Sequence, residues 1–247
     1  MQKLLMSVAL VSLSASVARA AAPAAQAAAP AGQERTARLL ADLLVAERAV
    51  VALNQPLIND ASKADKGFSA EVFGAAALAE FKKRSGLDLV PAKPANEAER
   101  MLAALFEASK QAVAEAQPVI NRPGMVFKGF TPAVFGLRTC ELFLQKTGVK
   151  IKQTSARYRN ALNRPDEFEV AGLTRLQDAA WKQGEGFGQE VEKPAKAYRY
   201  MLPVYAAKAC LSCHGDPKGE LDVAGRAKEG YQEGELRGAI SVVLPRK

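Results

Sequence analysis

Histidine, cysteine and long apolar segments are scarce in this sequence of 247 residues. It holds one histidine and three cysteines. A single histidine excludes any site that needs two imidazoles from this chain. After the first twenty residues, no stretch reaches the ~20 uninterrupted apolar residues that a membrane-spanning helix needs. We therefore expect no membrane span in the mature chain.

The first residues have the pattern of a secretory signal peptide. Lys3 precedes an apolar run from Leu4 to Val17, and Ala18-Arg19-Ala20 forms a small-x-small cleavage site. Residues 1–20 are therefore interpreted as a signal for export to the periplasm, with an uncleaved anchor as the alternative. Residues 21–33 are nearly all alanine, proline and glutamine, a composition that buries little apolar surface and is typical of a linker.

The basic residues are spread along the chain rather than clustered. The formal net charge is +8, and removal of Lys3 and Arg19 with the signal leaves 8 − 2 = +6. Scattered charge does not give the basic patch that a nucleic-acid footprint requires. We expect no nucleic-acid partner. The mildly basic surface either steers an acidic protein partner or simply keeps the protein in solution.

The sequence repeats itself at an offset of 62 residues. From Arg38 to Val90, 19 of the 53 pairs are identical, without a gap. The motif Gln-Pro-x-Ile-Asn at residues 55–59 returns at 117–121, and Lys-Gly-Phe at 66–68 returns at 128–130. Apolar residues at helical spacing predict a helical hairpin in each copy.

Two domains follow from this division. Residues 34–95 form the first hairpin, which we interpret as a structural extension, and residues 96–247 contain the second copy merging into a further domain. The predicted elements of that domain are strands over 149–154, 197–204 and 239–244, a helix over 167–182 with Trp181 in the core, and a short helix over 206–213. The fold class is therefore α+β, with antiparallel strands.

Cys210-Leu211-Ser212-Cys213-His214 is the motif that carries chemistry. On a helical turn, thiols three residues apart lie on one face and can reach both vinyl groups of one haem. The imidazole of His214 follows about 100° further round the helix and can bind the iron. With an export signal, this pattern predicts one covalently bound haem c.

Two other chemistries use the same residue types. A disulfide redox pair normally begins a long helix after a strand, whereas Gly215-Asp216-Pro217 ends this helix at once. A zinc site would need a fourth ligand such as Cys140, with the adjacent Cys213 and His214 on one tetrahedral ion. Both alternatives fit the motif less well than haem.

The sixth ligand of the iron stays open at this stage. Cys140 is the remaining thiol, and a lone cysteine is commonly an inert core residue. Met125 and Met201 are thioether candidates, although packing explains each of them as well. An iron without a protein ligand at this position is the remaining possibility.

Residues from about 128 to 245 resemble the PAS-like single-haem c-type family of bacterial periplasmic proteins and sensor-kinase input modules, whose type member is a cyanobacterial Tll-like soluble cytochrome. Beside the Cys-x-x-Cys-His motif, three segments carry the resemblance: 159–169 (RNALNRPDEFE), 199–204 (RYMLPV) and 230–242 (GYQEGELRGAISV).

The resemblance implies a PAS-like α/β domain with haem at one side. It also implies histidine and cysteine as iron ligands, as in the type member. Here the corresponding cysteine position falls at about Leu137, one helical turn before Cys140. Arg159, Asn160 and Arg199 lie in the matched segments. We expect them either to contact the haem propionates or to lock a loop of the domain by hydrogen bonds.

The sequence thus predicts a periplasmic monohaem c-type cytochrome that transfers electrons to a redox partner protein. The alternative is a haem-based sensor of redox state or of a diatomic gas, read by a sensor partner. An enzyme is the third class. It would need an open iron with a distal acid-base group, and no second histidine is available.

Overall fold

The computed structural model describes residues 31–193 and 195–246. The predicted signal peptide lies outside the described residues, as does most of the predicted linker. The chain begins with helix α1 (Ala31–Leu53), so its first turn includes the last residues assigned to the linker. No helix within the described ranges is long and apolar enough to cross a membrane.

Five helices come first in the chain. After α1 follow the single turn α2 (Gln55–Ile58), α3 (Ala70–Ser85), α4 (Glu97–Ile120) and α5 (Pro132–Thr147). Side chains of Ser69, Asn96 and Thr131 cap α3, α4 and α5 by accepting a backbone N–H of the first turn. α3 and α5 both end at a glycine in the left-handed region, where a Cβ would be strained.

The residues related by the offset of 62 make reciprocal contacts between α1–α3 and α4–α5. Gln55 Nε2 donates to the carbonyl of Phe130 at 2.9 Å, and Gln117 Nε2 donates to the carbonyl of Phe68 at 2.9 Å. The rings of Phe73 and Phe135 meet edge to face, with centroids 5.3 Å apart. The two halves of the helical layer are therefore held together by matched pairs of interactions.

A four-stranded antiparallel sheet follows, in the order β1-β4-β3-β2. Its strands are β1 (Lys150–Thr154), β2 (Phe187–Val191), β3 (Ala197–Tyr205) and β4 (Leu236–Pro245). The mixed architecture and the antiparallel strands agree with the sequence prediction. β2 was not predicted, and its five residues pair only with β3, as expected for an edge strand.

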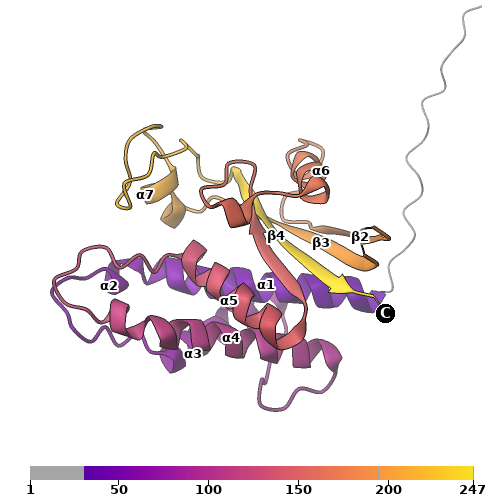
Figure 1. Cartoon of the computed structure of the whole chain (residues 1–247), viewed down its shortest axis with the longest axis horizontal. Coiled ribbons are helices and arrows are strands. Elements are labelled where there is room, and N and C mark those ends of the chain that lie inside the picture. Colours follow the sequence, from indigo (N-terminus) through magenta and orange to yellow (C-terminus); the bar gives the residue numbers. More distant parts are fainter. Residues whose placement is uncertain (1–30, 194, 247) are drawn as a thin grey trace, which may run out of the picture.

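Helices cover both faces of the sheet (Figure 1). α1 and α5 pack on one face in a core that includes Tyr200, Leu202 and Ile240. α6 (Glu167–Leu176) packs on the other face, where Met201 lies against Leu173. Alternate residues of β3 thus face different layers. The helix predicted over 167–182 ends at Leu176, and Trp181 packs half-buried against Phe187 beyond it.

The Cys-x-x-Cys-His segment occupies a connection between β3 and β4, outside the sheet. A short 3₁₀ turn, η2 (Lys208–Cys210), passes into the single turn α7 (Leu211–His214), which lies at one end of the molecule (Figure 1). Gly215 ends this turn by donating its N–H to the carbonyl of Leu211. Another 3₁₀ turn, η1 (Ala161–Asn163), follows β1.

Substitution of the two matched glutamines tests the helical layer. Gln55→Ala and Gln117→Ala each remove hydrogen bonds to two partly buried carbonyls, and each should lower the free energy of unfolding by about 1–3 kcal/mol. Urea titration of both variants measures the loss. A large loss of stability in one variant and none in the other would contradict equivalent roles of the two glutamines in holding the helical layer together.

Candidate functional site

A cavity lies where the helical layer meets the loops at the end of the sheet. Its volume is about 570 Å³, within the size range of small-molecule and cofactor sites. The wall is formed by α1 and α2, the start of α5, the segment from Gln153 to Asn163, the facing ends of β3 and β4, and the turn that carries Cys210 and Cys213. Apolar atoms make up most of its surface.

Cys210, Cys213 and His214 all line this cavity. Both thiols are free and partly accessible. The extended backbone at Ala207 precedes the two short turns, and Gly215 leaves them at once. The sequence predicted this short helix and its abrupt end. The turn places the side chains of Cys210, Cys213 and His214 together on one wall of the cavity.

A carboxylate fixes the orientation of His214. Nδ1 of His214 lies 2.8 Å from Oε2 of Glu229. Burial opposes ionisation of Glu229, but hydrogen bonds from Arg159 and His214 lower its pKa to about 2. The carboxylate can then only accept, so Nδ1 carries a proton. Burial lowers the pKa of His214, which favours the neutral ring with a lone pair on Nε2. A histidine held in this way is typical of a metal ligand.

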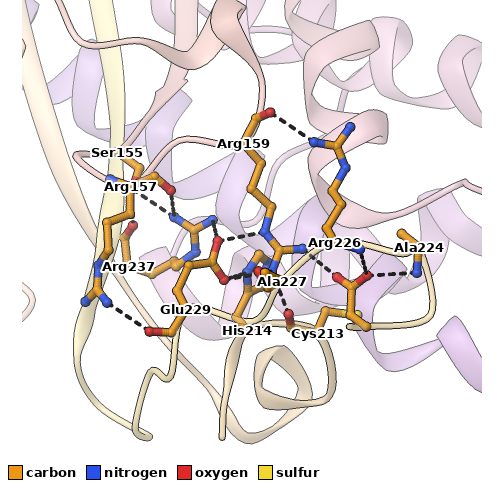
Figure 2. A network of polar contacts seen from close by, with 11 residues as sticks. Ser155, Arg157, Arg159, Cys213, His214, Ala224, Arg226, Ala227, Glu229 and Arg237 are labelled. Atoms are coloured by element: carbon orange, nitrogen blue, oxygen red, sulfur yellow. Dashed lines mark hydrogen bonds and ion pairs between the residues drawn. The ribbon is translucent and has the colours of Figure 1, made fainter. Parts of the chain in front are cut away.

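Arg159 binds three segments of the chain together (Figure 2). Its Nε donates to Oε1 of Glu229 at 2.6 Å, one terminal nitrogen donates to Oδ2 of Asp222 at 2.5 Å, and the other donates to the carbonyl of Cys213 at 2.7 Å. The guanidinium thereby locks the loop that carries His214. Arg237 adds a weaker contact, 3.8 Å from Glu229. Contact of Arg159 with a cofactor stays a prediction.

Asn160 and Arg199 have different positions. Asn160 lines the cavity, and its side-chain oxygen accepts the N–H of Leu162 at the start of η1. Arg199 does not line the cavity. It lies on β3 beneath α6, with ion pairs to Asp166 at 2.9 Å and Glu169 at 3.4 Å. The structure places Asn160, but not Arg199, on the cavity that the Cys-x-x-Cys-His motif lines.

None of the three candidate sixth ligands lines the cavity. Cys140 is buried in the core on α5, and burial raises the pKa of its thiol to about 12. Met201 is fully buried on the α6 side of the sheet, and Met125 lies half-buried in the loop before α5. Across residues 31–193 and 195–246, no group of three or more His, Cys, Asp or Glu side chains is arranged to hold a metal ion.

Several cavity residues were not found from the sequence. Arg48, Gln55 and Asn59 come from the first copy, which we interpreted as a structural extension. Asp222 comes from the loop between α7 and β4, as does Glu229, which contacts His214 but does not itself line the cavity. Gln55 and Asn59 belong to the repeated Gln-Pro-x-Ile-Asn motif, but the motif does not indicate a cavity. Only the packing of α1 on the sheet shows that both residues line it.

The chain belongs to the Tll0287-like family, whose sequence profile matches residues 32–245. The match includes the first repeat copy and is wider than the resemblance found from the motifs. Among solved structures, a chain described as the cyanobacterial heme-protein Tll0287 aligns with a TM-score of 0.44 and 18% identity, over 62% of this chain and 98% of its own. No curated protein sequence matches significantly.

Asp222 provides a pH-dependent test of the polar lock. Burial raises its pKa, but this effect is outweighed by hydrogen bonds from the N–H of Arg226 and the guanidinium of Arg159, so the pKa lies below its ordinary value. A depressed carboxyl pKa stabilises the fold above the unfolded pKa of about 3.9, and the stabilisation is lost as pH falls through the folded pKa. Asp222→Asn should therefore be less stable than the native chain at pH 7, and the difference should shrink below about pH 4.

Urea titrations at pH 7 and pH 3 measure this difference. Glu220→Asn is the control, because Glu220 lies in the same loop and pairs with Lys228 at an exposed position. A difference for Asp222→Asn that is equal at both pH values would contradict the role of the ionised carboxylate.

Proposed function

We propose that this protein is an exported periplasmic c-type haem protein with a PAS-like haem domain. Cys210 and Cys213 attach one haem through thioether bonds, and Nε2 of His214 binds the iron. The observation that carries the proposal is the arrangement of these three side chains on one wall of a 570 Å³ cavity, with His214 oriented by Glu229.

The residues of the cavity fit a haem. The wall is mainly apolar, as suits a flat macrocycle, and the imidazole already presents an unprotonated nitrogen. When bound, the haem supplies reversible one-electron exchange. Glu229 holds the Nδ1 proton of His214, and Arg159 keeps Glu229 ionised and in place.

Electron transfer to a redox partner protein is the first function we propose. Val134, Tyr158 and Val223 line the cavity and have side chains 51%, 40% and 57% exposed, so a cofactor in the cavity would reach the surface. Electron exchange with a partner protein requires such an exposed haem edge. We propose no enzymatic activity, because the one imidazole of the chain already serves as the ligand.

Sensing is the second candidate, and one observation favours it. Apart from Cys210, Cys213 and His214, the cavity-lining part of the described chain offers no thiol, thioether, amine or imidazole to the iron. An iron with an open position can bind a diatomic molecule or another small ligand. A partner would then detect the change at the PAS-like surface.

Covalent attachment is the direct test of the proposed function. Protein exported from a strain competent in cytochrome c maturation should have the mass of the chain without residues 1–20 plus one haem. Cys210→Ala combined with Cys213→Ala should remove the added mass. The purified protein should also exchange one electron reversibly in a redox titration. An apo mass for the native chain would overturn the proposal.

Glu229 should set the reduction potential. A carboxylate that accepts from Nδ1 makes the imidazole a stronger donor and stabilises ferric iron. Glu229→Gln should therefore raise the midpoint potential, as measured by spectroelectrochemistry. Glu220→Gln makes the same change of charge in the same loop, away from His214, and should leave the potential nearly unchanged. Equal shifts in the two variants would assign the effect to net charge alone.

A further inference from the structure

Arg48 brings a positive charge into the cavity without a counter-charge. It lies half-buried on α1, and its Nε donates to the carbonyl of Pro132 at 3.3 Å. Within the described residues its guanidinium has no ion pair with a carboxylate. Burial lowers its pKa, but arginine stays protonated in proteins. A desolvated cation with unused donors favours a bound anion.

The acidic groups beside Arg48 do not supply that anion. Glu47 is fully buried on α1, and burial raises its pKa well above the ordinary value, an effect that the neighbouring Ser109 hydroxyl only partly offsets. Cys140 is buried as well, and burial raises the pKa of its thiol to about 12. Both groups are therefore stabilised in their neutral forms.

Other arginines of the cavity wall already have partners. Arg159 binds Glu229 and Asp222, and Arg237 contacts Ser155 at 2.8 Å and Glu229 at 3.8 Å. Arg226 is exposed and donates to the carbonyl of Arg159. Arg48 differs from Arg159 and Arg237 because its half-buried guanidinium has no carboxylate partner within the described residues.

Arg48 also lies close to the attachment segment. Its helix, α1, contacts the turn η2 that ends at Cys210, and both residues line the cavity, whereas His214 is held by the loop that carries Glu229. Arg48 and His214 thus line the cavity from different elements, α1 and α7.

We propose that Arg48 holds a small inorganic anion at the sixth position of the iron. The inference rests on the proposed haem site and names the class of ligand that this site accepts. With a haem in this cavity, a ferric iron and the guanidinium of Arg48 would both attract negative charge, so an anion such as azide would gain from both, whereas neutral carbon monoxide would gain little from Arg48. Binding forms one coordination bond, and no group of the chain is displaced.

The holoprotein tests this with two ligands. Azide is titrated against the ferric protein and carbon monoxide against the ferrous protein, both followed by absorption spectra. Arg48→Gln should weaken azide binding by about tenfold or more, as the loss of a charge-assisted hydrogen bond implies, and should change carbon monoxide affinity by less than about twofold. Arg48→Lys should retain part of the azide affinity.

Lys110 supplies the matched control. It occupies the position of Arg48 in the second repeat copy, 62 residues later, and packs beside Gly74 outside the cavity. Lys110→Gln should leave the affinities for both ligands unchanged. Thermal unfolding of each variant shows whether the fold is retained.

Three outcomes would overturn the proposal. The first is that the ferric native protein binds no azide, as expected if the thiolate of Cys140 or the phenolate of Tyr158 already binds the iron. The second is that Arg48→Gln weakens the binding of azide and of carbon monoxide equally, as expected of a general distortion. The third is that Arg48→Gln leaves the azide affinity unchanged, as expected if Arg48 pairs with a haem propionate. Absence of covalent haem in the mass spectrum would instead refute the proposed function itself.

Discussion

The hydrogen bond between Glu229 and His214 is the interaction on which the candidate site depends. The carboxylate is only 13% exposed and stays ionised because Arg159 donates to both of its oxygens. In turn, Arg159 reaches Asp222 and the carbonyl of Cys213. One partly buried guanidinium therefore joins the loop after β1, the Cys-x-x-Cys-His turn and the loop before β4. Without Arg159, the imidazole of His214, which lies on a single helical turn, would have no fixed orientation.

The helical layer provides the other half of the site. α1 and α5 lie between the sheet and the outer helices α3 and α4, so each repeat copy contributes one helix to the inner layer. The contributions to the cavity are unequal. Arg48 and Gln55 of the first copy line the cavity, whereas the corresponding residues of the second copy, Lys110 and Gln117, do not. The two copies of the sequence repeat thus contribute unequally to the cavity wall.

Local patterns in the sequence predicted much of the fold. The Cys-x-x-Cys-His motif predicted the short turn that lines the cavity, and alternating apolar residues predicted three of the four strands of the described sheet. The helix predicted to continue to residue 182 ends at Leu176, because Trp181 folds back onto Phe187 instead of extending the helical stripe. β2 was missed, since Phe187–Val191 includes Gly188 and two polar residues and takes its strand form from pairing with β3. Contacts over long separations, such as Arg159 with Glu229, leave no local pattern at all.

The state of His214 before haem attachment tests the account most directly. The chain has one histidine, so protein labelled with ¹⁵N-histidine gives nitrogen signals from this residue alone. In the haem-free protein at pH 7, the account predicts a neutral ring with the proton fixed on Nδ1 and an unprotonated Nε2, and Glu229→Gln should remove this preference. A native ring protonated on Nε2, or one that averages between the two tautomers, would contradict a ligand oriented in advance by Glu229.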